Sequence, residues 1–139
     1  MRFLLRSLII LIAVPLAQAQ DSTTPSLVLF DDLQWGEVIP GVAFANAYGD
    51  WQTEAHGKFV RIESGTSVAL HTHTNPFHGV MLSGSLTNEY EGEVSPAGMG
   101  PGTYWYVPGD VPHINTCLSS EPCVFYTHLP GALDVTFVD

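Results

Sequence analysis

Short apolar or alternating segments, separated by Gly, Pro, Asn and Asp, constrain the fold most strongly. They cover residues 42–48, 58–63, 67–73, 79–82, 103–107, 113–117, 123–128 and 133–138. Eight or so short strands at this spacing are typical of antiparallel sandwiches and barrels. Only residues 31–34 could begin a turn of helix, with an aspartate as the cap, and residues 88–102 form the longest expected loop. The sequence therefore predicts an all-β domain.

The first 19 residues have the features of a secretion signal. Arg2 and Arg6 precede an apolar run over residues 8–16, and Ala17-Gln18-Ala19 offers small residues where a signal peptidase cuts. The alternative is an uncleaved anchor, which the shortness of the run disfavours. We therefore predict export to the periplasm or the medium, with residues 20–139 as one mature domain. With no second apolar run, no membrane association is expected after cleavage.

Removal of the signal leaves a strongly acidic chain. Of the four basic residues only Lys58 and Arg61 remain, against fourteen acidic ones. Such a charge balance argues against nucleic acids and anionic membrane surfaces as partners.

Histidines dominate the candidate chemistry. His71, His73 and His78 fall within eight residues, and His113 follows a Pro-Gly turn. In an extended His-x-His segment both imidazoles project from one face, which predicts a divalent metal site. Imidazole suits zinc, our first expectation, and also iron, copper and nickel. With an ordinary pKa near 6.5, such ligands would release the metal below about pH 6.

Two further histidines fit no motif. His56 precedes Gly57 at a strand start and is expected to be exposed. His128 ends a strand, so it could lie near the site or at the mouth of a barrel. Neither is given a role.

The only cysteines, Cys117 and Cys123, have five residues between them across a strand-loop-strand turn. In an exported protein such a pair most simply forms a disulfide. The alternative is that one thiolate binds the metal near His113.

Two stretches resemble the motifs of the cupin superfamily. The spacing of Gly65, His71-Thr72-His73, His78 and Gly84 is similar to the first motif, and the run from Gly102 through Pro108 to His113 is similar to the second. Together with the segment Pro-Gly-Thr-Tyr-Trp at 101–105 and the trailing cysteines, they resemble the cupin domain of ChrR-type anti-sigma factors and its stand-alone exported relatives of unassigned function.

The resemblance implies a single-domain cupin, a small antiparallel β-barrel or double-sheet jelly roll, over residues 20–139. It implies metal ligation by His71, His73, His113 and His78, the last in the slot where most cupins carry Glu. The spacing from His78 to Gly84 is one residue short of the motif. Loss of the carboxylate puts in doubt the manganese chemistry of oxalate decarboxylase-like and germin-like cupins.

Trp105 alternates with Tyr104 and Tyr106 in a strand that leads to His113. In similar cupins the face that carries this tryptophan looks into the barrel, so Trp105 is a candidate wall of a ligand pocket. Plain core packing is the alternative.

Three functions fit these features. The first is an exported domain that binds or senses a metal or small ligand, since ChrR-type domains bind zinc and serve regulation. The second is a metal-dependent enzyme, such as a histidine-ligated dioxygenase or an isomerase, for which no catalytic residue is assigned. The third is a metal-stabilised interaction module, such as a homodimer. Coordination number separates them, because four imidazoles fill a tetrahedral zinc and three leave a position open.

Overall fold

The computed structural model describes residues 25–90 and 98–138. Within these ranges the chain forms ten β-strands and one short 3-10 helix, η1 (Phe30–Asp32). The strands are β1 (Gly36–Ile39), β2 (Val42–Tyr48), β3 (His56–Ile62), β4 (Ser67–Thr72), β5 (Phe77–Ser83), β6 (Leu86–Tyr90), β7 (Tyr104–Val107), β8 (His113–Cys117), β9 (Cys123–Leu129) and β10 (Thr136–Phe137). No helix in the described part of the chain has the length and hydropathy needed to cross a bilayer. The predicted signal, residues 1–19, lies outside the described residues.

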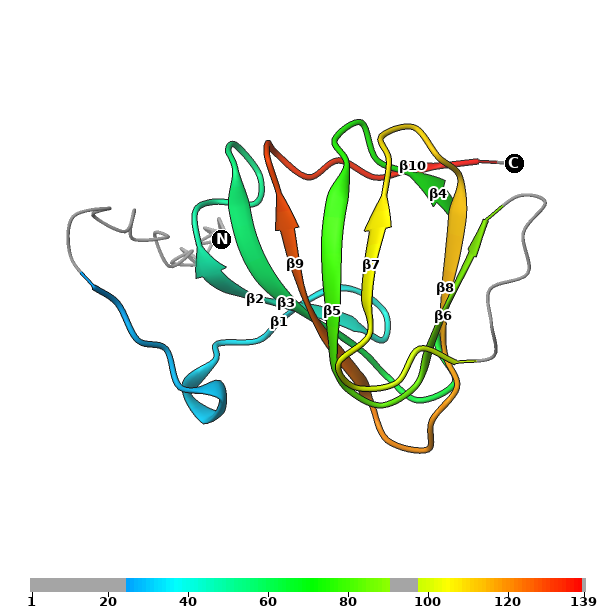
Figure 1. Ribbon diagram of the computed structural model, residues 1–139, viewed down its shortest axis with the longest axis horizontal. Helices are drawn as coiled ribbons and strands as arrows, with labels where there is room; N and C mark the ends of the chain where they lie inside the picture. Colours follow the sequence, from blue (N-terminus) through cyan, green and yellow to red (C-terminus); the bar gives the residue numbers. More distant parts are fainter. Residues whose placement is uncertain (1–24, 91–97, 139) are drawn as a thin grey trace, which may run out of the picture.

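The strands form two antiparallel sheets that face each other (Figure 1). One sheet has six strands in the order β1-β2-β3-β9-β5-β7, and the other has four in the order β10-β4-β8-β6. Several neighbours within the sheets are far apart in sequence, as in β3 beside β9 and β4 beside β8. This arrangement confirms the predicted all-β jelly roll.

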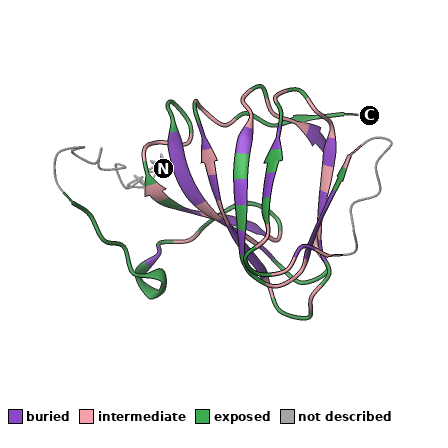
Figure 2. Ribbon diagram, in the orientation of Figure 1, coloured by how far each residue is buried: buried purple, intermediate pink, exposed green. Residues whose placement is uncertain are grey.

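The core lies between the two sheets, because alternate side chains of each strand point inward. Along β5, for example, Phe77, Gly79 and Met81 are buried while the residues between them are exposed, as the banding in Figure 2 shows. Burial of each large aliphatic or aromatic side chain contributes about 1.5–3 kcal/mol. The buried cluster comprises Val42, Val60, Ile62, Phe77, Met81, Leu86, Met99, Trp105, Val107, Cys117, Cys123, Phe125 and Leu129.

Two strands were not predicted, β1 and β6. In β6 the buried residues Thr87 and Asn88 are polar, so the segment lacks an apolar alternation. Both are paired with β8, since the Asn115 side-chain amide donates to Asn88 Oδ1 at 2.8 Å and the Thr116 N–H donates to Thr87 Oγ1 at 3.1 Å. Strand β6 therefore occupies the start of the predicted loop 88–102, of which residues 91–97 lie outside the described ranges.

The segment before β1 covers the outer face of β3. The Phe30 ring lies edge-on to Phe59 with centroids 6.1 Å apart, and the Arg61 guanidinium lies 4.9 Å from the Trp35 ring centroid. Arg61 also pairs with Glu63 at 3.2 Å. Arg61 is thus held on the outside of the barrel.

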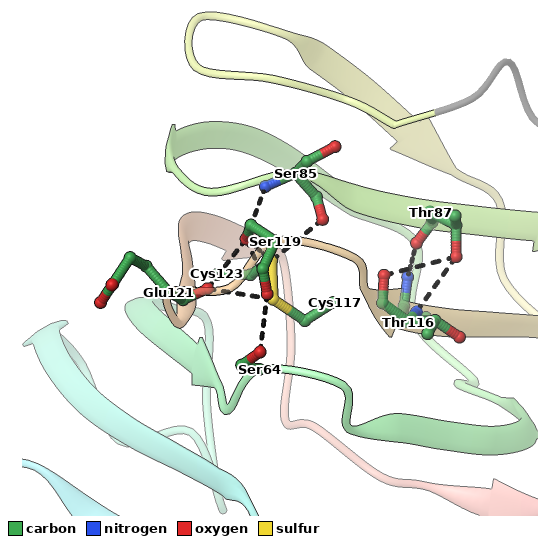
Figure 3. Close-up of a disulfide and its surroundings, with 9 residues drawn as sticks. Ser64, Ser85, Thr87, Thr116, Cys117, Ser119, Glu121 and Cys123 are labelled. Atoms are coloured by element: carbon green, nitrogen blue, oxygen red, sulfur yellow. Dashed lines mark hydrogen bonds between the residues drawn. A yellow bond between two sulfur atoms is a disulfide. The ribbon is translucent and has the colours of Figure 1, made fainter.

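The disulfide between Cys117 and Cys123 is present, as predicted. Cys117 ends β8 in the four-stranded sheet and Cys123 begins β9 in the six-stranded sheet, so the bridge joins the two sheets. In the turn between them, the Ser119 hydroxyl donates to the Glu121 carbonyl at 2.8 Å and accepts from the Ser85 N–H at 3.1 Å (Figure 3). Structural disulfides persist in oxidising compartments, so the bridge supports export.

Candidate metal centre

Three of the predicted ligands come together at one end of the four-stranded sheet. His71 lies near the end of β4, His73 follows that strand, and His113 begins β8 directly opposite His71. Their ring centroids are 4.2 Å apart for His71 and His113, 4.9 Å for His71 and His73, and 5.2 Å for His73 and His113. One nitrogen from each ring lies within 4.8 Å of the other two. We call this cluster the histidine triad.

Backbone carbonyls orient all three rings. Because a carbonyl oxygen only accepts, each Nδ1 must carry the hydrogen, which leaves a lone pair on each Nε2. His113 Nε2 is buried without any hydrogen-bond partner in the described structure. Metal-ligating histidines in proteins are held by the same kind of second hydrogen bond. The acceptors for His71, His73 and His113, at 2.7, 2.5 and 2.9 Å, are the carbonyls of Ala69, Asp134 and Val111.

Burial keeps the triad neutral. Loss of solvent around the rings lowers the pKa of His73 and of His113 to about 4 each, and it also lowers the pKa of His71. Metal binding requires neutral imidazoles, so no proton has to leave at neutral pH. Three convergent, neutral nitrogens with fixed tautomers fit a divalent transition metal such as zinc, iron, copper or nickel.

His78 is not part of the triad, which corrects its assignment as the fourth ligand. Strand β5 begins at Phe77, so alternation turns Phe77 inward and His78 outward. The Phe77 ring occupies the inner position, with its centroid 5.6 Å from His73 and 5.7 Å from His113. The sequence feature that accompanies the outward orientation of His78 is the spacing from His78 to Gly84, which is one residue shorter than in the cupin motif.

On the outer face His78 belongs to a group of exposed and half-buried rings. Its Nδ1 lies 2.7 Å from the Tyr104 hydroxyl, and its ring stacks on His128, its cross-strand partner, with centroids 6.3 Å apart. His128 in turn lies 2.5 Å from the Tyr48 hydroxyl through its Nδ1. His128 is therefore remote from the inward-facing triad.

A cavity of about 300 Å³ opens between the sheets beside the triad. His71 and His73 form part of its wall, which is otherwise mostly aliphatic and aromatic. Three protein ligands leave at least one coordination position for water or another molecule. The other residues that line the cavity are Val38, Ile39, Val42, Phe44, Trp51, Lys58, Val60, Ile62, Val68, Phe77, Asn115, Phe125, Thr127, Leu129, Leu133, Val135 and Phe137.

The sequence model of the ChrR cupin-like domain matches residues 23–132. The chain belongs to the ChrR cupin-like family. The match spans both motif regions and all three histidines of the triad, and it confirms the resemblance that the motifs indicated. No curated protein sequence matches the chain significantly.

Solved structures show the same fold for this ChrR-like cupin. KdgF from Halomonas sp. is 22% identical, with a TM-score of 0.63 over 76% of this chain and 94% of that one. The polyketide cyclase RemF from Streptomyces resistomycificus is 17% identical, with a TM-score of 0.70 over 84% and 87%. The anti-sigma factor ChrR of Rhodobacter sphaeroides, in complex with SigE, is 20% identical, with a TM-score of 0.59 over 73% of this chain and 50% of that one.

Trp105 is a core residue of the ChrR-like cupin and not a wall of the cavity. Its side chain points inward as predicted, but it packs on Phe125 with ring centroids 5.4 Å apart. The ring also lies across Gly79, its cross-strand partner on β5. Trp51 is the tryptophan that lines the cavity.

Replacing Gly79 with alanine is expected to destabilise the protein by about 1–3 kcal/mol, the usual effect of overpacking a core. A Cβ at this position would overlap the Trp105 ring, and that ring is buried. Denaturant unfolding measures the change. Gly36→Ala is the matched control, because a Cβ there meets nothing within 4 Å. Equal stability of the two variants would contradict the packing described for Trp105.

Lys58 and His56 are the functional candidates that the sequence did not reveal. The expectation that His56 is exposed was wrong, since its side chain is fully buried. Lys58, also on β3, is buried and lines the cavity beside the triad. The sequence feature that could have singled out Lys58 is that it is one of two basic residues after the predicted signal peptide.

Proposed function

We propose that this ChrR-like cupin is an exported metal-dependent enzyme that acts on a small organic molecule. The histidine triad would hold one divalent transition metal, zinc first among the candidates. The observation that carries the proposal is the position of the triad: three imidazole nitrogens lie within 4.8 Å of one another, two of the three rings line an apolar cavity, and His78, the expected fourth ligand, faces away. A purely structural zinc site is usually closed by four protein ligands, whereas catalytic sites keep a position open.

A bound metal of this kind supplies Lewis acidity to an oxygen of the substrate or of water. The chain supplies the surroundings. The carbonyl acceptors fix the three imidazoles, and the aliphatic and aromatic walls surround the reacting groups with apolar surface. The size of the cavity fits a small molecule, because ligand pockets begin at roughly 300 Å³. RemF, which has the same fold, is named as a polyketide cyclase.

Ligand binding or sensing without turnover is the second candidate. It is favoured by the family itself, whose namesake ChrR is an anti-sigma factor. The metal site and the cavity are common to both candidates, which differ in whether the bound molecule is converted.

Cobalt-substituted protein tests the open coordination position. Titration with azide is expected to change the visible d–d absorption, because azide can occupy a position that the three histidines leave free. The His78→Gln variant serves as the matched control and should respond as the parent protein does. A tetrahedral spectrum that azide leaves unchanged would show a closed, structural site and would overturn the enzyme proposal.

A further inference from the structure

Lys58 places a buried amine inside the cavity. It lies on the inward-facing side of β3, the face that it shares with Val60 and Ile62, and its side chain is only 3% exposed. No aspartate or glutamate is among the described residues that line the cavity. This is unusual in a chain with fourteen acidic residues, because buried lysines are normally paired with a counter-charge.

The neighbours of Lys58 position the amine without neutralising it. Its Nζ lies 3.1 Å from His56 Nε2 and 5.1 Å from the centroid of the Phe44 ring. His56 Nδ1 lies 3.0 Å from the Glu54 carbonyl and must therefore carry the hydrogen, so Nε2 accepts from the lysine. An ammonium has three N–H donors, and His56 accepts only one of them.

Thr127 adds a second unused polar group at the same place. It stands directly opposite Lys58 across the β3–β9 pair, and both line the cavity. Its hydroxyl is buried and has no hydrogen-bond partner in the described structure. Burying a polar group without a partner is unfavourable, so Lys58 and Thr127 together form a site that is incomplete without a ligand.

We propose that the cavity binds a small carboxylate with an apolar body. The carboxylate lies against Lys58 and Thr127, and the aliphatic and aromatic walls cover the rest of the molecule. His56 is a positioning residue that holds the amine. This inference rests on the proposed function in taking the cavity as the ligand site, but the charge recognition does not require the metal.

The pKa of Lys58 supports this assignment. Burial lowers the pKa of the amine to about 7, so part of the population is neutral at neutral pH. A bound carboxylate raises that pKa again, because an opposite charge favours the ammonium form. Binding should therefore take up protons above pH 7, and calorimetry in two buffers of different ionisation enthalpy measures that uptake.

The test compares hexanoate with hexanamide, which has the same chain without the charge. Isothermal titration calorimetry of the full mature protein is expected to show hexanoate binding about 10-fold or more tightly than hexanamide, the usual effect of a hydrogen bond to a charged group. Lys58→Met should remove this preference. Thr127→Val should weaken hexanoate several-fold, because the hydroxyl that donates to the carboxylate is lost. Arg61→Met is the matched control, because it removes the other cation of β3 from the outer face.

Each outcome decides the matter. Lys58→Met removes an unpaired buried charge and should raise the melting temperature of the ligand-free protein, which also shows that the variant folds. Equal affinity for the two probes, equal loss in Arg61→Met, or no binding of any straight-chain carboxylate from four to eight carbons overturns the inference.

Measurements on metal-loaded and chelator-stripped protein separate this inference from the proposed function. A preference for hexanoate that depends on Lys58 and persists without metal supports the inference, even if the cobalt experiment shows a closed site. A preference that disappears with the metal and survives Lys58→Met overturns the inference and leaves the metal site intact.

Discussion

Replacing His113 with alanine is expected to abolish tight metal binding. Only two imidazoles of the triad then remain, and His78 faces away from them. Loss of a group that merely orients a ligand typically costs 10–100-fold in metal affinity, so loss of the ligand itself should cost more. Competition with a chromophoric chelator measures the dissociation constant, and metal analysis measures the stoichiometry, which should fall from one to zero.

Two further variants complete the comparison. His73→Ala should give the same loss of metal binding. Because the His73 ring is only half-buried, this variant is less prone to a folding defect than His113→Ala. His78→Ala should retain the affinity and stoichiometry of the parent protein. Metal binding that falls equally in His78→Ala would mean that this ring reaches the site, and unchanged binding in His113→Ala would remove the triad as the site.

Acidification from pH 7 to pH 4 is expected to destabilise the metal-free protein strongly. The pKa values of His73 and His113 are about 4 in the folded state and about 6.5 in the unfolded chain. The unfolded chain therefore takes up protons first as the pH falls. The stability that the neutral rings contribute is complete above pH 6.5 and is lost on the way down to pH 4. At about 1.4 kcal/mol per pKa unit, the fully buried His113 alone accounts for on the order of 3 kcal/mol.

The stabilisation by metal should stay nearly constant between pH 7 and pH 5. Bound metal adds stability according to its affinity for the folded protein, and protons compete with it for His73 and His113 only near pH 4. Denaturant midpoints of stripped and zinc-loaded protein should therefore fall in parallel over that range. A gap that closes below pH 6 would indicate ordinary imidazole pKa values and would contradict the burial of the triad.

The ligand spacing was readable from the sequence because alternation on a strand is a local property. His71-Thr72-His73 and the Pro-Gly turn before His113 predicted the triad correctly. The orientation of His78 was not readable, because it depends on where β5 begins after the turn at residues 74–76. A shift of one residue exchanges the two faces of a strand. Phe77 thereby takes the inward place that the motif comparison gave to His78.

The burial of polar side chains was the other feature that could not be predicted from the sequence. His56 and Lys58 share the inward face of β3 with Val60, and nothing in the local pattern distinguishes that face from an exposed one. Their burial follows from pairing with β9 and from the cavity wall, which are contacts between residues about seventy positions apart. The pKa values of the triad depend on the same long-range packing, so the ordinary value of 6.5 that the sequence suggested does not hold for His73 and His113 in the folded protein.

The two ends of β8 differ in how firmly they are held. His113 begins this strand and Cys117 ends it, so the disulfide secures the sheets at the end away from the triad. The triad end is bordered by β10, a strand of only two residues that pairs with β4 at His71. Short edge strands open at low free-energy cost. Amide hydrogen exchange should therefore begin around β10 and the triad and reach the cystine last. Local opening at the triad end would then admit a ligand while the disulfide holds the two sheets together.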